Sequence, residues 1–178
     1  MNPAPETFDT TRLRARRVGV DDQPFLVSIF ADERVTRTLG GPRDEARVGD
    51  DIDRWNRHWD ERGFGLWILR LRTDGTPVGW TMLHTTTTGG PGVEVGWTVA
   101  ADHWRQGYAA EAATEAVDIG FGTVGLDRIV AFTLVDNVAS RGVMEKLGFA
   151  YEREVEHADL PHVLYATNRE DWERRTHG

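Results

Sequence analysis

The sequence predicts a single mixed α/β domain that spans residues 1–178, on the basis of three observations. Segments in which apolar residues alternate with polar ones, as in strands, interleave with segments of helical spacing. The 178 residues have a hydrophobic content of 39%, which suits one globular domain with a sizeable core. No internal repeat or low-complexity linker divides the chain. We expect residues 1–9 to be flexible.

The first half is expected to contain a strand, two helices and two further strands. Residues 13–18 form the first strand, and Asp21 or Asp22 can cap the helix that follows. After the turn at residues 40–42, a second helix carries apolar residues along one side among many charges. Strands at residues 64–71 and 78–86 flank a hairpin-like turn. The apolar positions of the two helices are Phe25, Leu26, Ile29 and Phe30, and then Val48, Ile52, Trp55 and Trp59.

The second half continues with a strand at residues 93–99, which alternates Val93, Val95, Trp97 and Val99. A turn at residues 104–109 then opens into a helix whose packed face is built of small residues. A strand at 128–134, a short helix at 137–147 and strands at 149–156 and 162–168 complete the order β-α-α-β-β-β-α-β-α-β-β. The small face contains Ala109, Ala112, Ala113, Ala116, Val117 and Gly120, with Glu111, Glu115 and Asp118 facing away.

The turn before this helix has the features of an anion site. A helix that begins there leaves its first N–H groups without intrahelical partners and places its positive dipole end at the turn, which suits a pyrophosphate. Gly107 lets the backbone approach an anion closely, and Ala109 adds little bulk. Taken alone, such a turn is common in α/β proteins of every kind.

Two motifs in order and at suitable spacing give the turn a more specific meaning. Trp104, Gly107 and Ala109 occupy the first, fourth and sixth places of a six-residue turn that resembles the phosphate-binding signature of the GCN5-related N-acetyltransferases (GNAT). Asn137 and Ser140, followed by E-K-L-G-F at 145–149, resemble the second motif of that family. The usual first residue is Arg or Gln, and Trp104 there is similar to the RimJ/RimL-like branch. This resemblance covers about a third of the chain.

The resemblance implies a fold and a cofactor. The fold is a mixed, largely antiparallel twisted sheet of about seven strands, splayed in the middle to admit the pantetheine arm and flanked by about four helices. Acetyl-CoA is the implied acyl donor, and a β-bulge near Val99 is expected to supply an oxyanion donor. The implied cofactor-binding residues are Trp97, Val99, Trp104, Arg105, Gln106, Gly107, Tyr108, Ala109, Asn137, Arg141 and Lys146.

The implied reaction is direct acetyl transfer to a primary amine in a ternary complex. This reaction requires a general base and a hydrogen-bond donor that stabilises the oxyanion. Glu94 is the candidate base, and its alternative is an exposed strand carboxylate. Asn137 is either a helix N-cap or a residue that orients the cofactor, and both can hold. Met144 stands where many relatives carry a tyrosine that protonates the thiolate. That proton comes from Ser140, from water or from no donor at all, since a coenzyme A thiolate is already a tolerable leaving group near neutral pH, and a purely structural Ser140 is the alternative.

Composition excludes several classes of function. The chain has no cysteine, so disulfides and thiolate catalysis are excluded, and a net charge of −8 argues against a duplex nucleic-acid binder. No stretch is long enough for a membrane span and the start lacks a signal peptide, so we expect a cytoplasmic protein.

We expect no metal, since His157 and His162 lack a fixed ligand spacing. Gly120 to Gly125 fits G-x-G-x-x-G but ends a helix, the reverse of the dinucleotide-binding context.

The acceptor is not determined by these patterns. The resemblance favours a protein N-terminus or a small-molecule amine, and it allows a homodimer. Trp55, Trp59 and Trp67 are interpreted as core residues, with the acceptor cleft as the alternative. The second hypothesis for the whole chain is a non-catalytic acyl-CoA-binding sensor or interaction module with the same fold, because the tyrosine is missing.

Overall fold

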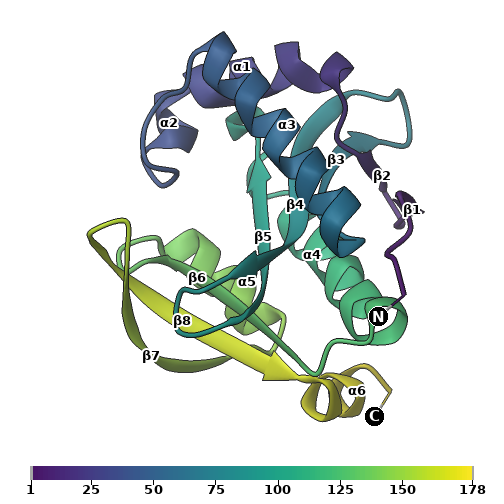
Figure 1. Ribbon diagram of the computed structural model, residues 1–178, viewed down its shortest axis with the longest axis vertical. Helices are drawn as coiled ribbons and strands as arrows, with labels where there is room; N and C mark the ends of the chain where they lie inside the picture. Colours follow the sequence, from purple (N-terminus) through teal and green to yellow (C-terminus); the bar gives the residue numbers. More distant parts are fainter. Residues whose placement is uncertain (1, 178) are drawn as a thin grey trace.

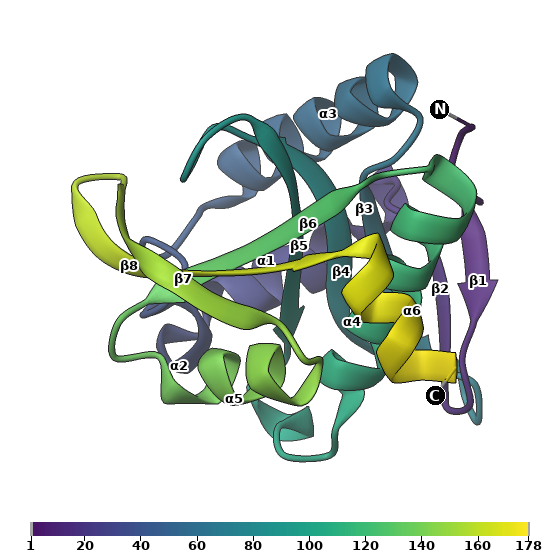
Figure 2. The same cartoon turned by 90° about the horizontal axis from the view of Figure 1, so that it is seen from below.

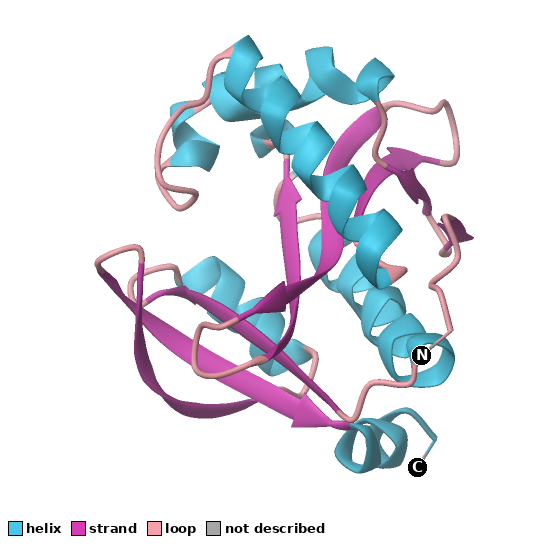
Figure 3. Ribbon diagram, viewed as in Figure 1, coloured by secondary structure: helices cyan, strands magenta, loops and turns pink. Residues whose placement is uncertain are grey.

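A computed structural model describes residues 2–177 and contains one eight-stranded sheet with helices on both sides (Figures 1 and 3). The strands are β1 (Thr7–Asp9), β2 (Leu13–Arg17), β3 (Leu66–Leu71), β4 (Pro77–Thr86), β5 (Gly92–Val99), β6 (Arg128–Leu134), β7 (Ala150–His157) and β8 (Leu160–Asn168). The helices are α1 (Gln23–Ala31), α2 (Glu33–Thr36), α3 (Glu45–Arg62), α4 (Tyr108–Asp118), α5 (Val138–Lys146) and α6 (Arg169–His177). Shorter helical segments are η1 (Val20–Asp22), η2 (Ala101–His103) and the π-helix η3 (Ile119–Val124).

The sheet has the order β1-β2-β3-β4-β5-β6-β8-β7, and every neighbouring pair is antiparallel except β5 and β6. Those two strands are parallel and share a single register pair, Glu94 with Val130, after which they diverge (Figure 1). The mixed, mostly antiparallel sheet with a splayed centre is therefore confirmed, with eight strands in place of about seven.

The larger core lies between the sheet and α4. On β5 the odd-numbered residues point to this side, where Val95 and Val99 are buried and Val93 and Trp97 pack at its margin. The alanine face of α4 explains the close helix–sheet packing, because its small side chains let the helix approach the strands. The fully buried residues of that face are Ala112, Ala113, Ala116 and Val117.

A second core lies on the opposite face, beneath α1 and α3. Leu26, Ile29 and Phe30 of α1 and Val48 and Ile52 of α3 pack on β3 and β4. All three tryptophans interpreted as core residues are buried, with exposed fractions of 7% for Trp55, which belongs to this second core, and of 4% for Trp59 and 0% for Trp67, which belong to the larger core. The core interpretation of this aromatic stripe is therefore correct.

The structure corrects the chain ends. Thr7–Asp9 pairs with β2 as β1, and the Ala4 N–H donates to the Gly63 carbonyl, so the flexible segment expected at residues 1–9 is ordered from residue 4 onward; Met1 lies outside the described residues. Helix α6 was not predicted, because its nine residues are almost all polar. Trp172 is buried and anchors this helix: it donates its indole N–H to Asp118 at the end of α4, and Figure 2 shows the two helices side by side.

Two further sequence interpretations concern helices. The glycine-rich segment 120–125 continues α4 as the π-helix and stops at Gly125, whose φ is +84°, so it is a helix end as expected. Asp22 does occupy the N-cap position of α1, but its carboxylate binds Arg16, Arg70 and the Gly19 N–H instead of the helix backbone. Within residues 2–177, no helix has the length and apolarity that a membrane span requires.

Candidate active site

Beyond Glu94, one edge of β5 is open toward β6. The Ala100 N–H donates to the Val78 carbonyl at 2.8 Å. With the register of β4 and β5, this bond shows which residues of β5 direct their main-chain groups toward β4. Even-numbered residues of β5 therefore bond to β4, and the odd-numbered ones direct their N–H and C=O groups toward β6. Since β5 and β6 share no register pair after Glu94 in the described part of the chain, the main-chain groups of Trp97 and Val99 face the split.

The β-bulge expected near Val99 is absent. The register between β4 and β5 runs without a shift from Gly92 through Val99, and it continues to Ala100. The expectation was wrong because the divergence from β6, not a bulge in β5, frees the backbone at this point. One of the freed groups is already used, since the Trp104 indole donates to the Val99 carbonyl at 2.7 Å.

The turn between η2 and α4 has the backbone of an anion site. Arg105 and Gly107 have positive φ angles of 59° and 82°, and turns containing left-handed residues form concavities of N–H groups. The first intrahelical bond of α4 is donated by Glu111 to the Gly107 carbonyl, so the N–H groups of Tyr108 and Ala109 precede the helical ladder. Trp104, Arg105 and Gln106 are exposed at this turn, Tyr108 is buried and Ala109 is half-buried.

Glu94 lies where β5 and β6 separate. Its partners in register are His84 on β4 and Val130 on β6, and Val130 belongs to a small apolar cluster with Leu164 and Ala166. Burial raises the pKa of the Glu94 carboxyl group to about 7, which is near the pH at which a general base works best. Glu94 is thus half-buried in apolar surroundings, and the alternative of an exposed strand carboxylate does not describe it.

Two histidines beside Glu94 were missed from the sequence. His84 faces Glu94 across the β4–β5 ladder, and the His58 ring of α3 stacks on the His84 ring with centroids 4.0 Å apart. His58 Nε2 accepts from the Thr85 N–H at 3.1 Å and its Nδ1 lies 2.8 Å from the Phe64 carbonyl, so Nδ1 carries the proton and the ring is neutral. Burial is the main cause that lowers the pKa of both rings, to about 4 for His58.

The second motif forms a polar chain at the start of α5. The Asn137 side chain accepts from the Ser140 N–H at 3.2 Å, so it is the N-cap of α5. Its amide group also donates to Thr133 Oγ1 at 2.9 Å and to Ser140 Oγ at 3.1 Å. Because Ser140 Oγ accepts from Asn137, its own hydroxyl proton is available to another acceptor. Met144 is 2% exposed and serves as a core residue.

The basic residues proposed for the cofactor are in different situations. Arg105 lies in the turn itself, whereas Arg141 on α5 donates to the Val135 carbonyl, and a hydrogen bond with Tyr165 raises its pKa. Lys146 is exposed at the last residue of α5. Arg128, which is near the motif in sequence, is held by Glu152 on β7.

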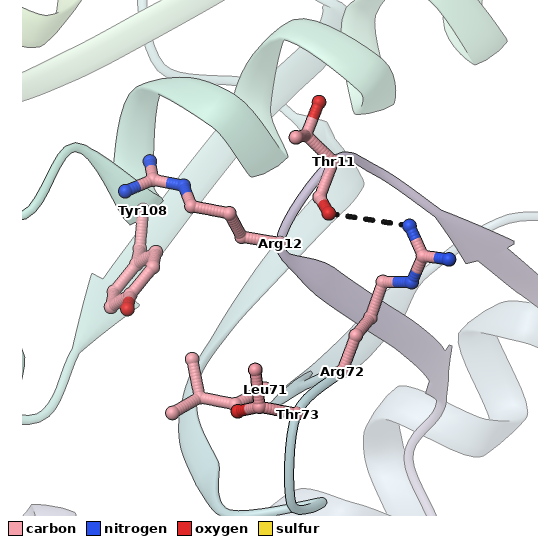
Figure 4. Close-up of a pocket in the computed structure, with 6 residues that line it drawn as sticks. All are labelled: Thr11, Arg12, Leu71, Arg72, Thr73 and Tyr108. Carbon is pink, nitrogen blue, oxygen red and sulfur yellow. Dashed lines mark hydrogen bonds between the residues drawn. The ribbon is translucent and has the colours of Figure 1, made fainter.

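Arg12 contacts the turn and was also missed. The pocket in Figure 4, of about 420 Å³, is lined by Arg12 and Tyr108 together with residues at the ends of β2 and β3, and by none from β5 or β6. It therefore lies beside the turn and not at the split. A charged residue in another turn, far away in sequence, leaves no local signal by which the contact could have been predicted.

His157 and His162 meet as the sequence allowed. Their ring centroids are 5.3 Å apart, and Phe132 packs against both rings. His157 Nδ1 lies 2.8 Å from Thr88 Oγ1 in the β4–β5 turn. The contact between His157 and Thr88 joins the β7–β8 hairpin to the turn between β4 and β5.

Comparison with known proteins gives consistent matches over most of the chain. A family model described as an acetyltransferase (GNAT) domain matches residues 12–150. The chain is 31% identical to FsC-acetyl coenzyme A-N(2)-transacetylase of Aspergillus fumigatus over an alignment of 192 positions. The alignment covers 96% of this chain and 80% of that protein. The crystal structure of an acetyltransferase from Agrobacterium tumefaciens is similar, with a TM-score of 0.82, 25% identity, and coverage of 95% of this chain and 98% of that one. RimJ of Mycobacterium smegmatis in complex with CoA-disulfide shares the fold, with a TM-score of 0.78, 20% identity, and coverage of 96% and 91%.

Proposed function

This chain belongs to the GNAT family and is an acetyltransferase, and from that premise we propose that it transfers an acetyl group from acetyl-CoA directly to a primary amine. The observation that carries the proposal is Glu94, a half-buried carboxyl group with a pKa of about 7 at the point where β5 and β6 separate. A group of this kind can deprotonate an amine that is held at the split.

The residues around the split fit a coenzyme A donor. The open main-chain groups of Trp97 would pair with the pantetheine amides, much as a neighbouring strand would, and the Val99 N–H remains for the thioester oxygen, because the Val99 carbonyl already accepts from Trp104. The turn at residues 104–109 offers N–H groups, a helix N-terminus and the Arg105 side chain to a pyrophosphate. Asn137 on α5 would orient the cofactor from the other side, with Arg141 and Lys146 farther along that helix.

Glu94 removes the proton that prevents reaction. A simple alkylamine has a pKa near that of lysine, about 10.4, and is therefore protonated at neutral pH. Glu94, directly or through a water molecule, takes one proton from the ammonium group, and the freed nitrogen attacks the thioester carbonyl carbon. A C–N bond forms as the C–S bond breaks, and the Val99 N–H, which faces the split, steadies the oxygen.

Ser140 supplies the proton that the departing thiolate takes up. Its hydroxyl group is oriented by Asn137, which donates to Ser140 Oγ and leaves the Ser140 proton free to be given to sulfur. The second proton that the nitrogen loses as the amide forms passes through water to the Ser140 oxygen, and so restores the hydroxyl group. This arrangement takes over the role of the tyrosine that Met144 replaces, and no step of the transfer needs a metal.

The acceptor class is a protein N-terminus or a small-molecule amine. The relative that shares 31% identity is named as an acetyl coenzyme A N(2)-transacetylase, which supports acetyl-CoA as donor and nitrogen as the acceptor atom. The neutral histidines beside Glu94 are compatible with a cationic amine, because they add no positive charge to the site.

The test is coenzyme A release, followed with a thiol reagent, from acetyl-CoA and either a short peptide with a free N-terminus or hexylamine. Because the protein has no cysteine, the reagent reports only released coenzyme A. We expect kcat/KM to fall as pH drops below about 7, because protonated Glu94 cannot act as a base. Glu94→Gln is expected to lower turnover roughly 100-fold or more and to abolish this inflection.

Glu115→Gln is the matched control, since burial also raises the pKa of that half-buried carboxyl group, which lies on α4. We expect this variant to keep the native profile. An unchanged rate and profile in Glu94→Gln would remove Glu94 as the base. Saturable acetyl-CoA binding without coenzyme A release from either amine would instead favour the non-catalytic sensor.

A further inference from the structure

Arg12 joins the turn between β1 and β2 to the first turn of α4. Its backbone N–H donates to Glu111 Oε1 at 2.8 Å and its Nε to Glu111 Oε2 at 2.6 Å, across 99 positions of sequence. Thr10 Oγ1 donates to the same carboxylate at 2.6 Å. Glu111 was expected to face solvent, but its side chain is only 16% exposed and is held by three hydrogen-bond donors from one turn.

The Arg12 guanidinium also touches the anion-binding turn itself. Its Nη1 donates to the Gln106 carbonyl at 2.7 Å, and its central carbon lies 4.6 Å from the centre of the Tyr108 ring. A Cβ placed on Gly107 would lie 3.3 Å from Arg12 Nη2. Figure 4 shows the Arg12 side chain extended toward Tyr108. One side chain thus contacts Gln106 and Tyr108, the residues on either side of Gly107.

The charge of Glu111 makes this contact important for an anionic ligand. Burial opposes ionisation of Glu111, but hydrogen bonds from Thr10 and Arg12 outweigh it and lower the pKa of the carboxyl group. An ionised carboxylate in the first turn of α4 would repel a phosphate bound at the same helix end, and the Arg12 charge cancels it. The turn keeps its positive end only while Arg12 is in place.

We propose that Arg12 is a positioning residue for the pyrophosphate of the donor: it fixes the turn through the Gln106 carbonyl and neutralises Glu111. The inference rests on the proposed function, because it names acetyl-CoA as the ligand. Arg12 acts through the turn and takes no part in the chemical step. Its loss therefore weakens donor binding through the phosphates and spares the thioester end.

The experiment compares two donors on the native protein and on Arg12→Gln. Acetyl-CoA carries the pyrophosphate, whereas S-acetyl-pantetheine has the same thioester and amides without it. Dissociation constants are measured from tryptophan fluorescence, since Trp97 and Trp104 flank the site. We expect Arg12→Gln to raise the Kd of acetyl-CoA about tenfold, the effect of losing a charge-assisted hydrogen bond, and to leave the Kd of S-acetyl-pantetheine unchanged.

Arg14→Gln is the matched control. Arg14 lies two residues farther along, is 66% exposed and is paired with Asp9, so this variant should bind both donors like the native protein. Adding Glu111→Gln to Arg12→Gln removes the uncompensated carboxylate, and we expect about half of the lost affinity, on a logarithmic scale, to return. Thermal unfolding of each variant verifies that it is folded, and Arg12→Met, which keeps the side-chain stem, replaces Arg12→Gln if that variant is not.

The outcomes separate the two proposals. Equal losses for both donors, no loss for either, or no recovery in the double variant would overturn the role given to Arg12 while leaving the acetyltransferase proposal intact. Failure of the native protein to bind acetyl-CoA would overturn the proposed function and the pyrophosphate role together.

Discussion

Two places beside the split sheet, the start of α4 and the surroundings of Glu94, handle charge in opposite ways. At the start of α4 the charges are present and paired, with Arg12 bound to Glu111 and to the turn carbonyl of Gln106. At the second place Glu94, His84 and His58 lie together, and burial shifts each pKa toward the neutral form. A paired Arg–Glu contact keeps its charge across pH 5–8, whereas groups shifted by burial titrate at a pH set by their surroundings.

Because of this difference, we expect the two halves of the site to respond to different changes in conditions. Donor binding at the start of α4 should respond to the geometry of the turn and to salt, but little to pH. Proton removal by Glu94 should respond to pH. Substitutions that move one property without the other test whether the division is real.

The largest effect is expected from Gly107→Val. Gly107 has a φ of +82°, a conformation that a β-branched residue adopts only under strain, and a Cβ there would lie 3.3 Å from Arg12 Nη2 and press on that guanidinium. We expect calorimetric titration with acetyl-CoA to show no measurable binding. The pH dependence of unfolding, which arises around Glu94, should be unchanged.

Gly75→Val is the control that distinguishes the effect of backbone strain from the effect of a side chain in the turn at residues 104–109. Gly75 has a φ of +77° in the β3–β4 turn, and a Cβ there would meet no other atom within 4 Å, so the variant carries the same backbone strain away from the cofactor turn. It should bind acetyl-CoA normally. Native-like binding by Gly107→Val would mean that the pyrophosphate does not lie at this turn.

A smaller effect, on stability, is expected from His58→Gln. The pKa of His58 is about 4 in the folded state and near 6.5 when unfolded, so the unfolded chain takes up the proton first as pH falls. His58 therefore contributes stability that is complete above about pH 6.5 and is lost as pH falls toward 4, by at most about 3 kcal/mol. In urea unfolding between pH 4.5 and 7.5, the unfolding free energy of His58→Gln relative to that of the native protein should therefore rise as pH falls.

The variant keeps a pH dependence of its own, because burial also lowers the pKa of His84 and raises that of Glu94, and the raised Glu94 pKa costs stability as pH rises. His103→Gln, a substitution at the end of η2 on the cofactor side, should keep the native slope. If His58→Gln and His103→Gln followed the same curve as the native protein, the stacked imidazoles would not be the source of the pH sensitivity.

The sequence predicted strand β5 and helix α4 better than the contacts between distant segments, for a physical reason. Val93 to Val99, Gly107 and the alanines of α4 act through local periodicity and backbone freedom, which are visible in a short stretch of chain. The pairing of Arg12 with Glu111 and the stack of His58 on His84 join elements distant in sequence, and single charges or histidines carry no pattern. Helix α6 was missed because Trp172, a buried residue, anchors a segment of almost uniform polarity.

The expected β-bulge near Val99 shows the same limit. The resemblance indicated that backbone groups would be free at this point, and the outward main chain of Trp97 and Val99 agrees with that expectation. The groups are freed by the divergence of β5 from β6 and not by a bulge. The divergence of two strands depends on what packs between them, and the sequence of either strand alone does not contain that information.

The smallest effect is expected from Trp104→Phe, at the junction of the two halves. The Trp104 indole N–H donates to the Val99 carbonyl, and so ties the anion-binding turn to the end of β5. Phenylalanine keeps an aromatic ring and removes one neutral hydrogen bond, worth about 1 kcal/mol, so the Kd for acetyl-CoA should rise about fivefold.

Trp67→Phe is the control. It likewise removes an indole hydrogen bond to a backbone carbonyl, that of Pro5, and should lower stability without changing the Kd. A Trp104→Phe variant that lost stability but kept its affinity for acetyl-CoA would show that the turn is held by Arg12 alone, and the connection between the two halves would then have to be sought in β5 itself.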